Sequence, residues 1–251
     1  MTELRLGKRP ATHDLRDLLF ADYKTGALKE APVGFGHLKL VKNPWGILLN
    51  DRLGDCAIAG PMHETMLLAA EGGHGVFFTD QNAQAVYTAA CGYDPADPST
   101  DQGCAVRDVL AYRASLGLVD AAGAVHKIGA YVAVESGNWG ELLEALNTFE
   151  CVGIGIQVPQ SAMDQFQNGE PWTVVEGSQI VGGHYVPVVA RPNEEIVEVV
   201  TWGAVQKMTA TFYKTYADEA WAYISTDALT ASGTTLEGFD LAALQEDLNA
   251  L

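Results

Sequence analysis

The chain has 251 residues, of which 48% are hydrophobic and 19% are charged. This composition is typical of a globular protein and excludes a disordered chain or a coiled coil. It carries 15 basic and 32 acidic residues, and the resulting net charge of −17 repels phosphate groups. We therefore expect no nucleic-acid partner and no binding to an anionic membrane surface.

No stretch of the sequence reaches the roughly 18 consecutive apolar residues of a membrane span. The first ten residues mix both signs of charge and lack the apolar core of a secretory signal. These features predict a protein that stays in the cytoplasm in which it is made, or that is packaged from it.

The first half of the chain is predicted to be mainly helical. Residues 1–45 are expected to form an extended, turn-rich arm that contains Pro10, Pro32 and Pro44. Apolar residues at helical spacing then predict helices over 55–70, 79–91 and 104–116, of which the second is capped by Thr79. Residues 46–125 are accordingly interpreted as a helical lobe.

The second half is predicted to be rich in β-structure. An amphipathic helix is expected over 139–149, and a last helix starts at Asp240. Strands are predicted over 128–134, 151–158, 183–190, 195–202, 204–209 and 219–225. Residues 126–251 therefore form a β-rich lobe, and the fold class is α+β with two lobes.

One segment places a cysteine at the start of the first helix, six residues after the side-chain amide of Asn50. The N-terminus of a helix stabilises a thiolate, which is the nucleophilic form of Cys56. The amide of Asn50 and the backbone N–H of Cys56 could both donate to an oxyanion. A cysteine at a helix start is, however, more often only a small apolar residue.

A second segment, in the other lobe, is Gly182-Gly183-His184, where the histidine opens a strand. An imidazole across a cleft from a thiol can take its proton and later give it to the leaving group. A further strand ends in Trp202-Gly203.

In this order and spacing the segments resemble the papain-like cysteine peptidases, over about residues 43–225. The resemblance implies a two-lobed fold, in which a helical lobe and an antiparallel β-barrel-like lobe enclose the active cleft. It implies that Cys56 is the nucleophile, His184 the general base and acid, and Asn50 the oxyanion donor. It also implies a peptide or protein substrate, no metal, no organic cofactor, and substrate contacts by Gln102, Gly103, Gly183 and Trp202.

The finer pattern resembles papain-like proteins of bacteriophages and actinobacterial prophages. It comprises Gly54-Asp55-Cys56, Thr100-Asp101-Gln102-Gly103, Gly182-Gly183-His184, Thr201-Trp202-Gly203 and Asp218-Glu219-Ala220. This resemblance leaves a second function open. The fold would then be catalytically idle and would serve as a virion or assembly component that contacts other phage structural proteins.

The chain departs from the peptidase family at several positions. Val200 stands where the family has the asparagine that orients the histidine, and valine cannot accept a hydrogen bond, so Thr201 is the candidate orienter. Pro61 would kink a helix that starts at Cys56, or else the helix begins at Pro61 itself. Only 55 residues precede Cys56, fewer than the long inhibitory pro-segment of secreted members needs.

The four cysteines are widely spaced and form no CxxC motif, so neither a disulfide nor a zinc site is expected. We predict free thiols at Cys56, Cys91, Cys104 and Cys151.

Overall fold

The computed structural model describes residues 4–225 and 239–250. Its largest element is an antiparallel sheet in which the path of neighbouring strands runs β4-β9-β5-β6-β7-β8. The strands are β4 (Ile128–Ala133), β5 (Val152–Pro159), β6 (Ile180–Asn193), β7 (Ile196–Thr201), β8 (Ala204–Thr209) and β9 (Ala217–Ser225). Within the described chain β4 and β8 are not paired with each other, so the lobe expected to resemble a barrel is an open sheet.

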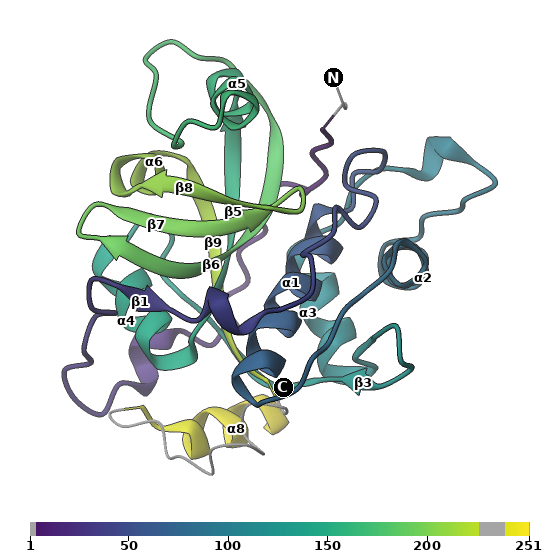
Figure 1. The fold of residues 1–251 in the computed structure, drawn as a ribbon. Coiled ribbons are helices and arrows are strands. Elements are labelled where there is room, and N and C mark those ends of the chain that lie inside the picture. Colours follow the sequence, from purple (N-terminus) through teal and green to yellow (C-terminus); the bar gives the residue numbers. More distant parts are fainter. Residues whose placement is uncertain (1–3, 226–238, 251) are drawn as a thin grey trace.

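Helices flank this sheet on different sides (Figure 1). One group forms the helical lobe: α1 (Cys56–Glu71), α2 (Asp80–Cys91) and α3 (Val106–Ser115). Another group accompanies the strands: α4 (Trp139–Phe149), α5 (Gln160–Asn168), α6 (Ala210–Tyr216) and α8 (Leu241–Ala250). Short elements complete the chain: the 3-10 turns Phe20–Tyr23, Leu38–Leu40 and Pro98–Thr100, β1 (Phe35–Gly36), and the hairpin of β2 (Leu118–Val119) and β3 (Val125–His126).

The α+β class and the antiparallel sheet expected from the sequence are confirmed. The three helices of the first half lie within two residues of their predicted bounds, and Thr79 caps α2 through its side chain. Two helices, α5 and α6, were not predicted. They span only 9 and 7 residues, which is too short for the apolar periodicity of a helix to stand out.

Helix α1 begins at Cys56 and not at Pro61, which lies inside the helix. Because proline lacks an N–H, it removes one intrahelical hydrogen bond. Fourteen of the sixteen residues of α1 are buried, and its face meets the sheet where Gly60 packs against the ring of Tyr185 on β6. Surrounding packing thus keeps the helix continuous through the proline, with Cys56 in its first turn.

A buried ion pair holds α1 to α3. The Arg113 guanidinium donates to Glu64 at 2.7 Å, and the side chains are 2% and 0% exposed. The Tyr185 hydroxyl donates to the same carboxylate at 2.8 Å, and Arg113 lies 4.2 Å from the centroid of the Tyr223 ring. Both helices and strands β6 and β9 are therefore joined through one charged cluster.

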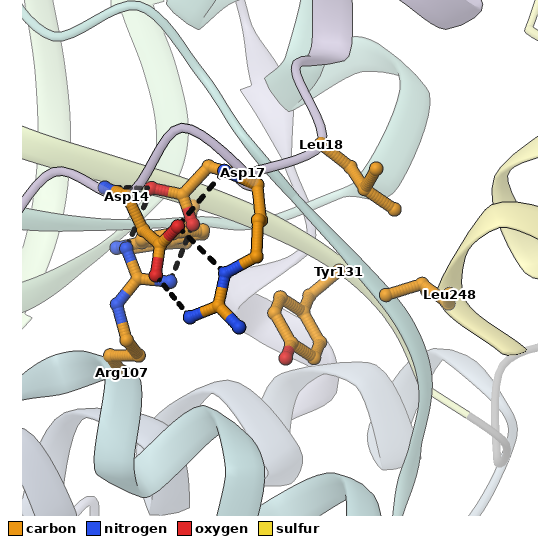
Figure 2. Close-up of a pocket in the computed structure, with 8 residues that line it drawn as sticks. Asp14, Asp17, Leu18, Arg107, Tyr131 and Leu248 are labelled. Carbon is orange, nitrogen blue, oxygen red and sulfur yellow. Dashed lines mark hydrogen bonds and ion pairs between the residues drawn. The ribbon is translucent and has the colours of Figure 1, made fainter. Parts of the chain in front are cut away.

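The arm of residues 4–45 touches both lobes. Phe20 is fully buried in the core of the sheet lobe, and β1 pairs with the end of β6. Arg107 of α3 binds the Asp17 carboxylate with two hydrogen bonds of 2.5 and 2.6 Å (Figure 2). These groups line a hollow of about 170 Å³ whose apolar side includes Tyr131 and Leu248.

The expectation of free thiols at all four cysteines is wrong. Cys91 at the end of α2 and Cys104 before α3 form a disulfide, with their Cα atoms 5.4 Å apart. The intervening loop folds back on itself, so two cysteines that are 13 residues apart become neighbours. Cys56 and Cys151 are free and buried. No helix among the described residues is both long enough and apolar enough to cross a membrane.

Candidate functional site

Cys56 is the first residue of α1 and is only 1% exposed. Burial raises the pKa of the thiol to about 11, although nearby backbone groups of Tyr185 on β6 and of Gly7 in the arm act in the opposite direction. In this state the side chain is a neutral thiol at neutral pH.

His184 lies on β6, next to Tyr185, and is 1% exposed. Its Nε2 is 2.7 Å from the hydroxyl of Thr201, at the end of β7. The imidazole stacks on Trp202, with ring centroids 4.4 Å apart and planes inclined by 19°. Val200, the residue in the asparagine's place, is buried in the core. Thr201 thus holds one edge of the imidazole, and Trp202 covers one of its faces.

The other imidazole nitrogen, Nδ1, is buried and has no hydrogen-bond partner among the described residues. Cys56 is therefore not hydrogen-bonded to His184 in this state. Burial lowers the pKa of His184 to about 3, so the ring is neutral. A neutral thiol and a neutral imidazole lie on adjoining elements, but no thiolate–imidazolium ion pair has formed.

Asn50 lies in the turn before α1, and its amide donates to the carbonyl of Leu53 at 3.1 Å. A side-chain amide has two protons, and the Leu53 carbonyl accepts one of those of Asn50. Asp55, the residue before Cys56, is completely buried, and neither of its carboxylate oxygens has a hydrogen-bond partner in the part of the chain that the structure describes. Burial raises the pKa of Asp55 well above its ordinary value, and the proximity of this carboxyl group contributes to the raised pKa of Cys56.

The space in front of Cys56 is filled by residues 5–9, which we call the N-terminal segment. Figure 1 shows the start of the chain descending between α1 and the sheet. Arg5 N donates to Asn50 O at 3.0 Å, and the Trp202 indole donates to Arg5 O at 3.2 Å. The N-terminal segment closes the cleft between the two lobes. It therefore covers Cys56, which lies on the side of the helical lobe that faces the cleft.

Both walls of the cleft pair with the N-terminal segment through backbone groups. On the helical side, Cys104 N donates to Gly7 O at 2.8 Å, and Arg9 N donates to Cys104 O at 2.9 Å. On the sheet side, Gly183 O accepts from Gly7 N at 3.1 Å and from Lys8 N at 3.0 Å. The walls therefore hold an extended peptide between them.

The residues predicted to contact substrate lie along these walls. Gln102 O accepts from the Arg9 guanidinium at 3.2 Å, and Gly103 N donates to the Tyr87 hydroxyl at 2.9 Å. The same hydroxyl donates to Asp101 at 2.7 Å, and Asp101 accepts from Gly54 N at 3.0 Å. Asp101 and Tyr87 thus fix the loop of Gln102 and Gly103 against the turn that carries Cys56.

Sequence reasoning allows the arm to bridge the two lobes, but it missed that the N-terminal segment fills the cleft and contacts an acidic group there. Lys8 is buried, and its ammonium lies 3.0 Å from both Asp218 and Glu219 on β9. The pair Asp218-Glu219 is noted in the finer resemblance, but without a role. No local pattern links it to Lys8, because the contact spans 210 residues.

A metal-ligand cluster lies elsewhere in the described chain. Donor atoms of His37, Glu71 and Glu150 lie within 4.8 Å of one another, with His37 Nδ1 2.9 Å from Glu71 and 3.2 Å from Glu150. The two carboxylates share the imidazole, which by itself explains their approach.

The backbone arrangement is that of known cysteine proteases. Xylellain, a cysteine protease from Xylella fastidiosa, matches with a TM-score of 0.64 and 15% sequence identity, over 89% of this chain and 97% of its own. The chain has the papain-like fold.

Two further solved structures have the same fold. Digestive procathepsin L 3 of Tenebrio molitor matches with a TM-score of 0.53 and 13% identity, over 88% of this chain and 74% of its own. Procathepsin B S9 of Trypanosoma congolense matches with a TM-score of 0.56 and 10% identity, over 88% of this chain and 86% of its own. No protein-family model and no curated protein sequence matches this chain.

Proposed function

We propose that this protein is a cysteine peptidase that becomes active when the N-terminal segment leaves the cleft. Cys56 is the nucleophile, His184 the general base and acid, Thr201 the residue that orients the imidazole, and Asn50 an oxyanion donor. The observation that carries the proposal is the set of contacts on His184. One imidazole nitrogen bonds to Thr201, one face lies on Trp202, and the other nitrogen is free to receive a proton.

The chemistry follows from these groups. His184 Nδ1 takes the thiol proton, and Cys56 Sγ attacks the peptide carbonyl carbon. The Asn50 amide and the Cys56 N–H donate to the oxyanion. As the C–N bond breaks, His184 gives the proton to the leaving amine, and a thioester remains. Water, deprotonated by His184, then hydrolyses the thioester and releases the acid.

Closure of the cleft explains why the resting thiol is neutral. Burial is the largest cause of the raised pKa of Cys56 and the cause of the lowered pKa of His184. Both charged forms become more stable when water and substrate groups replace the N-terminal segment. Opening therefore favours the ion pair that attack on a carbonyl requires.

The test is the rate of alkylation of Cys56 by iodoacetamide between pH 4 and 10. Gly7→Val opens the cleft, because a side chain at residue 7 would overlap the carbonyl oxygen of Gly54. We expect slow reaction of the wild type and, for Gly7→Val, a plateau that extends below about pH 7 and is lost in Gly7→Val/His184→Ala. Mapping of the modified peptides separates Cys56 from the other free thiol, Cys151.

The result that would contradict the proposal is a different pH profile of the alkylation rate. A single rise near pH 8.5 in Gly7→Val, unchanged by His184→Ala, is the behaviour of an ordinary thiol and would overturn the peptidase proposal.

The second candidate function is that of a catalytically idle fold that acts as a virion or assembly component. The observation that favours it is the closed cleft, in which Cys56 and His184 share no hydrogen bond. Under this proposal the N-terminal segment is a permanent part of the core, and Gly7→Val lowers the melting temperature without exposing a reactive thiol.

We also propose that the protein resides in the cytoplasm of its host or in a virion. Of these two places the virion fits the Cys91–Cys104 disulfide better, because disulfides persist mainly in oxidising surroundings.

A further inference from the structure

The N-terminal segment places one charged side chain inside the cleft. The side chain of Lys8 is 0% exposed, and its ammonium contacts Asp218 and Glu219 at 3.0 Å each. The carbonyl of Arg9 accepts a third hydrogen bond at 3.1 Å. An ammonium has three donors, and here all three have acceptors.

The two carboxylates are held in place by groups other than Lys8. The Trp221 indole donates to Glu219 at 2.9 Å, and the Gln157 amide on β5 donates to Asp218. The pocket is therefore fixed by β5 and β9 and does not depend on the lysine for its shape.

The wall of the pocket also fits a lysine stem. A Cβ on Gly155 would come within 2.7 Å of Cδ and Cε of Lys8 and 2.6 Å of Glu219 Cγ. Only glycine at this position leaves room for the four-carbon stem beside the carboxylate. A planar guanidinium is wider and presents five donors in a rigid fork, whereas the two carboxylates of the pocket converge on a single ammonium.

The backbone on either side of Lys8 is bound as an extended peptide would be. Gly7 O and Arg9 N both pair with Cys104, while Lys8 N pairs with Gly183 on the opposite wall. These contacts involve only main-chain atoms, so apart from the need for glycine at the position of Gly7 they do not select a sequence, and side-chain pockets must supply the remaining specificity. The pocket around Lys8 encloses this charged side chain completely.

We propose that the pocket formed by Asp218, Glu219, Gln157 and Gly155 is a lysine subsite that selects substrates. It takes a lysine side chain of a peptide bound in the cleft, and Lys8 is its intramolecular occupant in the closed state. This inference rests on the proposed peptidase function and adds the substrate class: peptides in which a lysine follows a glycine. Emptying the pocket leaves two adjacent carboxylates without a cation, so a lysine-containing peptide favours the exchange with the N-terminal segment.

The experiment uses the full chain carrying Gly7→Val, with internally quenched heptapeptides built on residues 4–10. In one series the position of Lys8 is lysine, arginine, norleucine or glutamate. Two readouts are taken: kcat/KM for cleavage, and protection of Cys56 from iodoacetamide by the uncleaved peptide. Lys8→Ala serves as a second opened chain in case Gly7→Val fails to fold.

We expect the lysine peptide to exceed the norleucine peptide by about 30-fold or more in both readouts, since charged hydrogen-bonded pairs discriminate by about 2 kcal/mol or more. In Gly7→Val carrying Asp218→Asn/Glu219→Gln the lysine-to-norleucine ratio should fall to less than about threefold. The matched control, Glu194→Gln/Glu195→Gln, removes two adjacent exposed carboxylates from the β6–β7 turn and should keep the ratio.

The outcomes separate the two proposals. Cleavage without preference for lysine overturns the subsite and leaves the peptidase standing. If no peptide is cleaved, the peptidase proposal is wrong. Protection of Cys56 then still tests the lysine subsite, and equal protection by the lysine and norleucine peptides would overturn the subsite.

Discussion

At the scale of single residues, the contact between His184 and Thr201 takes the place of the missing asparagine. The Thr201 hydroxyl lies 2.7 Å from Nε2, and both side chains are buried. In Gly7→Val/Thr201→Val the imidazole loses this partner, and an unpaired buried polar group costs about 1–3 kcal/mol. We expect kcat to fall at least about tenfold, as it does when a catalytic histidine loses its orienting group.

Thr201→Ser in the same background is the control, because it keeps the hydroxyl. The measurement is kcat with a cleaved lysine peptide, together with the pH profile of Cys56 alkylation. If Thr201→Val and Thr201→Ser behave alike in both assays, Thr201 does not orient the imidazole.

The neutral, buried His184 also predicts how stability depends on pH. Its pKa is about 3 in the folded chain against an ordinary value of 6.5, so below pH 6.5 the unfolded chain binds a proton that the folded chain refuses. Stability contributed by this histidine is present above pH 6.5 and is lost as the pH falls toward 3. His63, whose pKa burial lowers to about 4, acts in the same direction, whereas the raised pKa of Asp55 acts in the opposite one.

Thermal melts between pH 7 and pH 4 check this linkage. We expect the melting temperature of the wild type to drop more steeply with acidification than that of His184→Asn, which has no proton to bind at this position. Parallel curves for the two chains would show that His184 is not kept neutral in the fold.

At the scale of elements, the Glu64–Arg113 pair makes α1 a fixed platform for Cys56. Arg113→Met leaves Glu64 buried and without its cation, and breaking a buried pair in this way costs about 3–5 kcal/mol. Glu64→Gln/Arg113→Met removes both charges and should recover most of that loss. Urea unfolding of the two variants measures the difference, and a double variant no more stable than Arg113→Met would show that charge burial is not the cause.

Elements also show how far the sequence could predict this molecule. The place of Cys56 at a helix start can be predicted, because an apolar helical pattern begins there directly after a turn. The place of His184 at a strand start can be predicted, because two glycines precede a β pattern. The sequence leaves the start of α1 open between Cys56 and Pro61, because proline disfavours a helix interior and only packing against β6 decides where the helix begins. It indicates Thr201 as the orienting residue only because Val200, which stands in the asparagine's place, cannot accept a hydrogen bond.

Long-range contacts account for what the sequence could not predict. The place of residues 5–9 in the cleft could not be predicted, because their partners in the cleft walls lie about 100 and 175 residues away in the sequence. Contacts of that range leave no local sequence pattern. The Cys91–Cys104 bond likewise depends on the path of the loop between α2 and α3. The substrate contacts proposed for Gln102, Gly103, Gly183 and Trp202 remain predictions until a peptide is bound.

At the scale of the whole molecule, the disulfide and the closure of the cleft are coupled. Cys104 bonds covalently to Cys91, and its backbone N and O pair with Gly7 and Arg9 of the N-terminal segment. Reduction frees the loop that carries Gln102 and Gly103, which is one of the two walls holding the segment. A disulfide that closes a loop of about 15 residues contributes about 3 kcal/mol to stability.

We therefore expect Cys91→Ser/Cys104→Ser to lower the free energy of unfolding by about 2–4 kcal/mol and to speed alkylation of Cys56. The two effects are separable, because global unfolding exposes Cys56 and Cys151 together, whereas opening of the cleft exposes Cys56 alone. Peptide mapping under native conditions should find Cys56 modified several times faster than in the wild type while Cys151 stays protected. If the alkylation rates of Cys56 and Cys151 rise equally, the disulfide stabilises the fold as a whole and does not specifically stabilise the bound state of the N-terminal segment.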